Sequence, residues 1–548
     1  MKKPTLSELT LREKIGQTCV QLVSDSKGDP DYYIKNPYGS IWTSRWMMGA
    51  EDIIEEFAKH GYDMGDLENY SKNFPLWLAD VNKRLKVPML CPLDAEAGLG
   101  PEVPTASNTP LTSCIGSANS EQLAFDVGRN VAEEAKASGC RWVWAPVADN
   151  PSMFSGVSSL RNYSHDIEHI SRMLCAQIKG IQSAGVAATV KHFPGADKHE
   201  YRDPHFQPTL MSYTIEEWEK EQAPAFQAAI DAGVLSVMVG HYAFPAVDDW
   251  QVDGTYVPAT LSYKIVTELL KEKMGFKGVV VTDGIGMRGL SAFYTGKDLY
   301  VALLRAGNDV ILGPIVEGYI DDVEQAVLAG ELPESRIDDA CQRVLDMKEK
   351  LGMFDDDFDI GTGLTDAMRE ASAKTNREIA RKGMTLLANK NGLIPISSND
   401  IKNVTIVYDG YSDVAYNNLQ YMVEEFERHG AKAHYRRSIE SPQDMKNVSD
   451  ESDLIVYVSY IAGHQPMGMP MYQGADNKKL EFILNHGKEK SIGVSLAYPF
   501  MYYNYFLNMP VYINTFGSSR QNIEEFVKGL YGEFSFSTTS PFPIKPEF

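Results

Sequence analysis

Polar side chains that can act as acids, bases or nucleophiles follow several short apolar runs in the first half of the sequence. They are Asp94 after MLCPL, Asp149 after WVWAPVA, Lys191 and His192 in ATVKHF, His241 after VMVG and Asp283 after GVVVT. The apolar runs are typical of strands that are buried on both faces of a parallel sheet. Because the carboxyl ends of parallel strands lie at one end of a sheet or barrel, we expect these six side chains to form one site.

Asp283 is the sharpest candidate for a nucleophile. An apolar strand, residues 278–281, precedes it, and the small residues Gly284 and Gly286 follow it. A carboxylate that is fixed by a strand and exposed by a loop with little side-chain bulk can attack an electrophilic carbon. The structural alternative is an aspartate that caps the N-terminus of a helix beginning in GIGMRGL.

His205 lies in the loop KHEYRDPHFQP, which is dense in charged, proline and aromatic residues. Asp203 lies two residues earlier, close enough in an extended loop to orient the imidazole. Such a pair can act as general acid and base near neutral pH. The D-x-H spacing alone also fits a solvated loop histidine, and His199 and Glu200 are alternative acid/base candidates in the same loop.

Apolar runs alternate with helical patterns through the first 350 residues or so. Strands are expected at residues 89–93, 142–147, 187–192, 235–240, 279–282 and 309–312. A helix is expected over residues 120–138, where apolar residues recur every four positions. This alternation indicates parallel βαβ units, and the length of this part favours a (β/α)8 barrel of the TIM type over an open sheet.

The acidic, glycine-containing segment FDDDFDIGTGLT interrupts this alternation and is expected to be a linker. A second α/β pattern follows, with a helix at residues 417–429 and strands at residues 404–408, 454–459, 492–496 and 511–515. We therefore predict an α/β protein with a catalytic barrel domain over residues 1–353. A linker over 354–366 and a C-terminal α/β layer domain over 367–548 complete the expected organisation.

The composition is that of a globular protein, with 43% hydrophobic and 23% charged residues among 548. The formal net charge of −22 argues against nucleic acid and anionic membranes as main partners, because both are bound through lysine and arginine. No apolar run typical of a secretory signal or a membrane span occurs. Six cysteines without CxxC spacing indicate reduced thiols, so we expect a cytoplasmic protein.

A series of motifs occurs in one fixed order along the chain. They are EKIGQ at 13–17, LDAEAG at 93–98, APVADN at 145–150, KHFPG at 191–195, DPH at 203–205, VMVGHYAFPAVD at 237–248, PATLS at 258–262, GFKGVVVTDGIGM at 275–287 and GMTLLANKNGLIP at 383–395. Together they resemble glycoside hydrolase family 3, and the resemblance covers nearly the whole chain. The ordered pair of KHFPG and GFKGVVVTD is the specific part of this signal.

The resemblance implies roles for the residues found above. Asp283 is similar to the catalytic nucleophile of the family, and Lys191 nearby would help to keep it ionised. His205 with Asp203 resembles the acid/base dyad of the β-N-acetylglucosaminidase branch. The sugar hydroxyls would be held by Asp94, Arg161, Lys191 and His192, and His241 is a further substrate-binding candidate. No metal and no organic cofactor is implied.

Two segments depart from the usual pattern of this branch. The loop after KHFPG is slightly longer than usual, and AEAGLG replaces the usual EGGR, so that the arginine of that segment is missing. Both departures concern the substrate and leave the implied catalytic residues in place.

We therefore predict a retaining, exo-acting β-glycosidase that removes a terminal β-linked N-acetylhexosamine through a glycosyl–aspartate intermediate. The alternatives within the family are a β-glucosidase or β-xylosidase with a carboxylate acid, and a phosphorylase, since a neutral histidine base does not repel phosphate. The alternative outside catalysis is a sugar-binding protein. The expected partner is a small-molecule or oligosaccharide substrate, and the oligomeric state is open, with a homodimer as one option.

Overall fold

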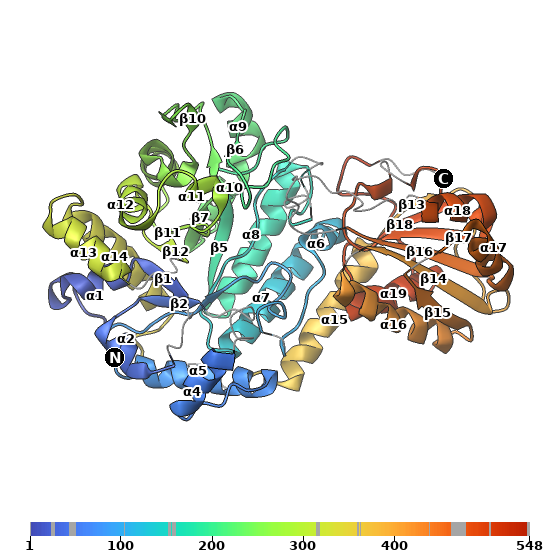
Figure 1. The fold of residues 1–548 in the computed structure, drawn as a ribbon, viewed down its shortest axis with the longest axis horizontal. Helices are drawn as coiled ribbons and strands as arrows, with labels where there is room; N and C mark the ends of the chain where they lie inside the picture. Colours follow the sequence, from blue (N-terminus) through green and yellow to red (C-terminus); the bar gives the residue numbers. More distant parts are fainter. Residues whose placement is uncertain are drawn as a thin grey trace. The chain divides into compact units, whose positions relative to one another are not determined.

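Two compact units make up the chain, and each is described by itself (Figure 1). The first consists of Met1–Asn108, Ala124–Asn150 and Leu174–Ser372, and the second of Thr109–Leu123, Pro151–Met173 and Ala373–Phe548. The computed structural model describes residues 2–22, 28–42, 51–103, 105–151, 155, 160–313, 318–358, 361, 363–410, 412–437, 439–461, 478–502 and 506–544.

A ring of parallel strands forms the centre of the first unit. Five strands pair in the order β11-β7-β5-β4-β3, and three pair in the order β12-β1-β2. Parallel bridges from Ser40 to Leu90 and from Val281 to Val310 join the two sheets into a closed barrel. In chain order the strands are β1 (Cys19–Leu22), β2 (Ser40–Trp42), β3 (Pro92–Leu93), β4 (Trp142–Val143), β5 (Ala187–Phe193), β7 (Ser236–Val239), β11 (Val279–Thr282) and β12 (Ile311–Leu312).

Helices alternate with the barrel strands along the chain. In order they are α1 (Leu11–Gly16), α2 (Pro30–Lys35), α4 (Glu51–Lys59), α5 (Leu67–Asn82), α6 (Thr112–Ala118), α7 (Glu121–Ala137), α8 (Ile167–Ser183), α9 (Ile215–Glu221), α10 (Ala223–Asp231), η3 (Lys264–Lys273), α11 (Arg288–Ser291), α12 (Gly296–Ala306), α13 (Tyr319–Leu328) and α14 (Glu334–Lys350). Of these, α6 and the first residues of α7 and α8 belong to the second unit. Figure 1 shows α12, α13 and α14 outside the strands. Val344 of α14 belongs to the same buried cluster as Trp142, Val279 and Val281 of the strands. This architecture confirms the predicted (β/α)8 barrel.

Short elements lie in the N-terminal segment and in the loops of this unit. They are η1 (Leu6–Glu8), β6 (Thr209–Leu210), β8 (Tyr242–Ala243), β9 (Gln251–Val252), β10 (Thr255–Tyr256) and η2 (Ala259–Leu261). β6 pairs with β8 in parallel, and β9 and β10 form an antiparallel hairpin. Both pairs lie in segments that follow the barrel strands β5 and β7, so they belong to the loops that can shape a site.

The apolar pattern predicts six of these barrel strands but neither β1 nor β2. β2 has only three residues, and β1 contains the polar Gln21, so neither forms an apolar run long enough to be recognised. The predicted strand at residues 89–93 is shortened to Pro92–Leu93, and the one at residues 142–147 to Trp142–Val143.

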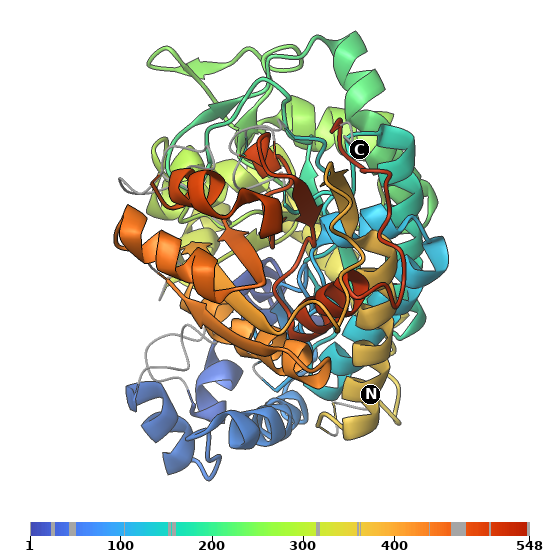
Figure 2. The ribbon, with the colours of Figure 1, turned by 90° about the vertical axis from the view of Figure 1, so that its right-hand side faces the viewer.

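A six-stranded sheet forms the second unit, in the order β13-β18-β17-β16-β14-β15. Only β13 runs antiparallel to its neighbour, as the pairing of the described strands shows. The strands are β13 (Thr385–Asn389), β14 (Asn403–Gly410), β15 (Lys432–Arg436), β16 (Leu454–Tyr460), β17 (Ser491–Ser495) and β18 (Val511–Asn514). The helices are α15 (Asp366–Gly383), α16 (Asp413–Arg428), α17 (Pro442–Glu451), α18 (Lys478–His486), η4 (Lys488–Lys490) and α19 (Arg520–Leu530). Figures 1 and 2 show this sheet between layers of helices.

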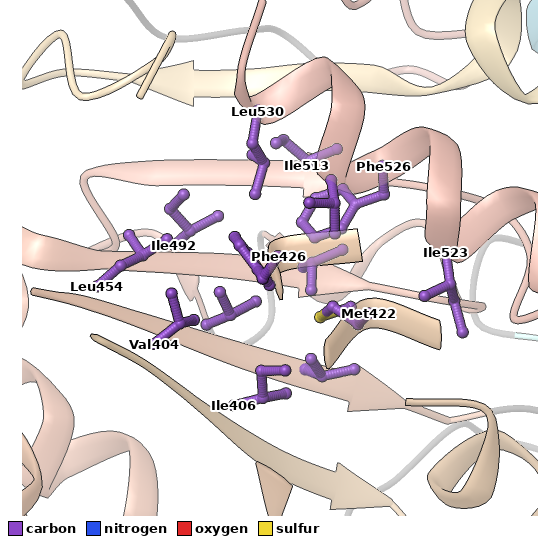
Figure 3. Close-up of a cluster of buried hydrophobic side chains, with 14 of the residues drawn as sticks. Val404, Ile406, Met422, Phe426, Leu454, Ile492, Ile513, Ile523, Phe526 and Leu530 are labelled. Atoms are coloured by element: carbon purple, nitrogen blue, oxygen red, sulfur yellow. The ribbon is translucent and has the colours of Figure 1, made fainter. Parts of the chain in front are cut away.

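The core of the second unit lies between the sheet and the pair α16 and α19. Val404 and Ile406 of β14 belong to one buried cluster with Met422 and Phe426 of α16 and with Ile523 of α19 (Figure 3). Strand residues two apart point to the same face, and helix residues four apart do so as well, which is why this pattern buries one face of each element. The structure confirms the predicted α/β layers and adds β13 and β15.

The predicted linker lies between the end of α14 at Lys350 and the start of α15 at Asp366. Its described residues before Asp366 form neither helix nor strand, whereas Asp366 begins α15, and residues 359, 360 and 362 lie outside the described part of the chain. The division into domains at residues 1–353 and 367–548 stays a prediction.

All six cysteines carry free thiols in the structure. Within the described residues, no helix is both long enough and apolar enough to cross a membrane.

Lys348 of α14 is a buried lysine whose amino group lies near the start of several barrel strands, and burial lowers its pKa to about 7. Its Nζ donates to Gln17 Oε1 at 2.7 Å, to the carbonyl of Gly39 at 2.9 Å and to the carbonyl of Pro88 at 2.6 Å. We expect Lys348→Met to lower the free energy of unfolding by about 3 kcal/mol or more, because three buried acceptors lose their donor. Urea unfolding checks this against Lys350→Met, an exposed site on the same helix, and equal midpoints for the two variants would contradict it.

Candidate active site

Asp283 follows β11 and is held by backbone contacts on both sides. Its N–H donates to the carbonyl of Val239 on β7 at 2.9 Å, and the N–H of Gly284 donates to Asp283 Oδ1 at 2.7 Å. The following helix, α11, has Met287 as its N-cap residue. Asp283 is therefore not a helix cap, and the structural alternative from the sequence is wrong. One carboxylate oxygen is left to face reacting groups.

His192 lies beside Asp283 and is oriented by Asp149. The ring Nε2 of His192 lies 3.9 Å from Asp283 Oδ2. On its other side, Nδ1 lies 2.8 Å from Asp149 Oδ2, and the backbone N–H of His192 donates to Asp149 Oδ1 at 2.9 Å. A carboxylate bound at Nδ1 fixes the ring orientation and favours the proton at that nitrogen. The strand-end residues of β4, β5 and β11 thus meet as predicted.

His241 is buried and uses both ring nitrogens within the protein. Nδ1 lies 3.0 Å from Thr260 Oγ1, and Nε2 lies 3.1 Å from the carbonyl of Gly284. Burial lowers the pKa of His241, although the nearby charge of Asp283 acts to raise it. The contacts favour a role in positioning the 283–284 turn over direct contact with a sugar. Thr260, its partner, is not predicted by the sequence pattern.

The electrostatic surroundings keep Asp283 ionised. Burial acts to raise the pKa of its carboxyl group, but the nearby charges of His192, His241 and His205 outweigh burial and lower the pKa to about 2. Lys191 is expected from the sequence to keep Asp283 ionised, but the charges that lower the pKa of Asp283 are chiefly those of the histidines. A carboxylate that stays charged in a partly closed site is suited to attack a carbon that develops positive charge.

Lys191 lies between two carboxylates at the same end of the barrel. Its Nζ contacts Asp94 Oδ1 at 2.6 Å and Glu96 Oε1 at 2.5 Å. Lys191 is buried, whereas 45% of the Asp94 side chain remains exposed. The Asp94 carboxylate can therefore still accept a hydrogen bond from a hydroxyl group. Glu96 is a member of this group that the sequence analysis does not name. Alternating donors and acceptors of this kind suit a ligand rich in hydroxyl groups.

The predicted pair of His205 and Asp203 is formed. Nδ1 of His205 lies 2.6 Å from Asp203 Oδ1, and the backbone N–H of His205 donates to the same oxygen at 2.9 Å. Asp203 is fully buried, whereas a third of the His205 side chain is exposed. The charge of His205 is among those that lower the pKa of Asp283, which indicates that the dyad lies near this carboxylate. Because Nδ1 faces Asp203, Nε2 is the ring nitrogen on the opposite edge from that carboxylate.

The loop that carries His205 is attached to α11, which follows the nucleophile candidate. The N–H of Arg288 donates to the carbonyl of His205 at 3.2 Å, and the N–H of Gly289 donates to the carbonyl of Pro204 at 2.9 Å. A Cβ atom at Gly289 would lie 2.9 Å from the Pro204 oxygen and 3.3 Å from His241 Cβ. Only glycine lets the two loops approach this closely.

The alternative acid/base candidates of the same loop have other contacts. Glu200 is 7% exposed, and its Oε1 and Oε2 each accept from Arg202 Nε at 2.9 Å. Its Oε2 also accepts from the N–H of Leu210 at 3.2 Å. His199 is 75% exposed and pairs with Asp197. Glu200 thus serves as a structural ion-pair partner, and His199 faces solvent.

Arg161 lies in the second unit and is partly buried. The remaining predicted site residues lie in the first unit. Its predicted contact with a sugar hydroxyl therefore stays a prediction.

One group among the described residues has the composition of a metal site, namely Glu425, His429 and Glu533 of the second unit. Its atoms already bind one another. His429 Nδ1 contacts the carbonyl of Glu425 at 2.8 Å, and Nε2 contacts Glu533 Oε1 at 3.0 Å. Glu425 also pairs with Arg428. These contacts join the end of α16 to the segment that follows α19, which accounts for the group without a metal ion.

Comparison with known proteins assigns the family. The family described as the glycosyl hydrolase family 3 N-terminal domain matches residues 10–347, which contain the barrel and the Asp283 and His205 groups. The chain belongs to glycoside hydrolase family 3. The match agrees with the order of the KHFPG and GFKGVVVTD motifs along the chain.

Two relatives are similar over much of the chain. A β-N-acetylglucosaminidase/β-glucosidase of Cellulomonas fimi is 25% identical over 475 residues, which is 83% of each chain. A β-hexosaminidase A of Pseudoalteromonas piscicida is 25% identical over 379 residues, which is 65% of this chain and 62% of that protein.

Solved structures share the fold over nearly the whole chain. A family 3 β-N-acetylglucosaminidase of Paenibacillus sp. FPU-7 has a TM-score of 0.80 at 23% identity, covering 98% of this chain and 100% of that one. A β-glucoside phosphorylase has a TM-score of 0.82 at 22% identity, covering 98% and 95%. Both likenesses concern the fold.

Proposed function

We propose that this chain is a retaining, exo-acting β-glycosidase that removes a terminal β-linked N-acetylhexosamine. The observation that carries the proposal is the ionised Asp283 at the end of β11 together with the Asp203–His205 pair in the same barrel. A protein that only binds sugar needs neither an ionised nucleophile nor an oriented proton donor. Family membership supports glycosidic chemistry at this site.

The residues divide the reaction into two displacements. Asp283 attacks the anomeric carbon while His205 gives its proton to the leaving oxygen, and a covalent glycosyl–aspartate forms. His205, now neutral, then takes a proton from water, which attacks the anomeric carbon and releases Asp283. Asp203 stabilises the imidazolium form and fixes the orientation of the ring through Nδ1. Asp94 and Lys191 bind hydroxyl groups of the sugar and so fix the anomeric carbon against Asp283.

The sugar is assigned from two considerations. The histidine dyad resembles the hexosaminidase branch, and the relatives from Cellulomonas fimi and Pseudoalteromonas piscicida carry names of that activity. Glucosidase activity is the main alternative, because the first of these names includes it. A neutral His205 does not repel an anion, so phosphate can replace water in the second displacement, and phosphorolysis is the second candidate reaction.

A panel of p-nitrophenyl β-glycosides tests the proposal. We expect the N-acetylglucosaminide to be cleaved faster than the N-acetylgalactosaminide and the glucoside. Parallel reactions with and without inorganic phosphate distinguish free sugar from sugar 1-phosphate as product. Faster cleavage of the glucoside would favour the glucosidase alternative, and cleavage of none would overturn the enzymatic proposal.

The compartment is proposed from the thiols. All six cysteines are free, and five of them are buried, which fits a reducing compartment such as the cytoplasm.

The pH dependence of the first displacement follows from the pKa of Asp283. Because this pKa is lowered to about 2, the carboxylate stays charged well below neutral pH. We expect inactivation by a dinitrophenyl 2-deoxy-2-fluoro glycoside, whose leaving group needs no proton, to keep a constant rate from about pH 7 to about pH 4. The rate is obtained by withdrawing samples at intervals and assaying the activity that remains in each. A midpoint above about pH 5 would show that the nucleophile titrates in a different environment.

A further inference from the structure

A pocket opens on the first unit, and none of the residues of the candidate active site lines it. Its volume is about 570 Å³, within the usual range of about 300–1,000 Å³ for small-molecule sites. Three aromatic residues, Trp250, Tyr263 and Tyr294, line it. Leu261 and residues of α12 form the apolar remainder, and a few charged groups stand among them.

The aromatic side chains are exposed to an unusual degree for their size. Trp250 is 43% exposed and Tyr263 is 51% exposed, although most large apolar side chains of the barrel are buried. Exposed aromatic surface around a hollow costs free energy in water and marks surfaces that bind a partner. Aromatic rings with polar edges suit ligands that have one apolar face and polar rims.

A buried carboxylate holds two of these aromatic residues in place. Asp248 Oδ1 accepts from the N–H of Trp250 at 3.4 Å. The same side chain accepts from Ser262 Oγ at 2.5 Å and contacts Lys264 Nζ at 3.3 Å. Because Ser262 and Lys264 flank Tyr263, one carboxylate fixes both the Trp250 loop and the Tyr263 segment. The backbone that carries the two aromatic side chains is therefore fixed before a ligand arrives, which reduces the ordering cost of binding.

The polar groups of the pocket belong to Asp298, Arg305 and Glu331. Arg305 Nε donates to the backbone carbonyl of Glu331 at 2.9 Å, so its guanidinium is held at the edge. Lys297 Nζ pairs with Glu331 Oε2 at 3.0 Å, so the two carboxylates are balanced by one guanidinium and one ammonium group. Such a site offers both acceptors and donors to the hydroxyl groups of a neutral ligand.

We propose that this pocket is a second carbohydrate-binding site, which holds a neutral pyranose of an oligosaccharide against Trp250 and Tyr263. The C–H face of a pyranose ring is apolar and its equatorial hydroxyls project outward, which matches an aromatic wall with carboxylates at the rim. The assignment to sugar rests on the proposed glycosidase function. The pocket is built from the segments that follow β7 and β11, and Thr260, near its Tyr263 wall, contacts His241.

Calorimetric titration with the tetramer of β-1,4-linked N-acetylglucosamine tests this proposal. The titration uses the full chain with Asp283→Asn, so that the sugar is not consumed. We expect Trp250→Ala, added to this background, to bind one equivalent of tetramer fewer, or to bind the weaker equivalent about tenfold less tightly. Trp250→Phe keeps an aromatic ring and should retain most of the binding. Tyr263→Ala tests the opposite wall independently of Trp250.

Tyr256→Ala is the matched control, because Tyr256 lies in the neighbouring β9–β10 hairpin and does not line the pocket. Equal binding by the parent, the Trp250→Ala and the Tyr263→Ala proteins overturns the proposal. Trp250→Ala alone, with Asp283 retained, is then assayed for hydrolysis of a small aryl glycoside. This assay separates the test of the second site from the test of the proposed glycosidase function. That activity should stay within about twofold, because Trp250 touches no reacting group, whereas inactivity of the unsubstituted protein counts only against the glycosidase function.

Discussion

Asp283→Asn is expected to reduce turnover of an aryl β-glycoside by at least about 10⁴-fold, because an amide cannot form the glycosyl ester. The carboxylate is held at the end of β11 by the backbone of Val239 and Gly284, and the asparagine can keep the first of these contacts. The loss should therefore fall on kcat while the sugar still binds. Added azide, which can attack the anomeric carbon directly, should restore part of the activity and give the glycosyl azide of inverted configuration.

The same variant should remain folded with a modest loss of stability. The folded-state pKa of Asp283 lies below the ordinary value of 3.8, so its ionisation stabilises the fold above about pH 4, and this contribution is lost as the pH falls toward 2. Removing the charge at pH 7 removes that contribution. Thermal melting of Asp283→Asn beside the parent protein measures this loss of stability. Asp149→Asn, which weakens the contact that orients His192, provides a comparison.

Trapping of the intermediate identifies the nucleophile independently of activity loss. Incubation with a 2-deoxy-2-fluoro glycoside should place the label on the peptide that contains Asp283. Mass spectrometry of the digested protein locates the label. A label on Asp94 or Glu96, which lie with Lys191 at the same end of the barrel, would overturn the assignment.

The strand-end rule explains why much of the site is predictable from sequence. Buried parallel strands leave an apolar run, and the first polar residue after the run lies at the mouth of the barrel. Lys191, His192 and Asp283 follow this rule. In the structure Lys191 contacts Asp94, and His192 lies beside Asp283. The apolar run of β1 is broken by Gln21, and β2 has only three residues, so neither strand is predicted.

Partners that depend on loop packing have no such local signal. Thr260 lies 19 positions after His241, and only the folded loop brings its hydroxyl to the ring. Glu96 could have been found from D-x-E spacing, since residues two apart in an extended segment share a side, and both contact Lys191. The choice between Glu200 and His205 as the proton donor also needs the structure, because only the structure shows that Glu200 forms an ion pair with Arg202.

His205→Ala is expected to impair substrates with poor leaving groups far more than activated aryl glycosides. The reason is that an activated aryloxide leaves without a proton, whereas an alkyl or sugar oxygen needs one, and general acid catalysis contributes about 10² to 10⁴-fold. Kcat/KM measured against leaving-group pKa should therefore become much steeper in the variant. Azide should partly restore the second displacement, because it needs no general base.

Three further variants decide whether His205 or a neighbour is the acid. Asp203→Ala removes the buried partner at 2.6 Å but leaves the imidazole, so the same bias should appear more weakly. Glu200→Gln and His199→Ala should keep the leaving-group dependence of the parent protein, since one side chain is bound to Arg202 and the other is largely exposed. If the steep dependence is found in Glu200→Gln and is absent from His205→Ala, a carboxylate is the proton donor. In that case the hexosaminidase-type dyad is wrong, and the glucosidase-like alternative takes its place.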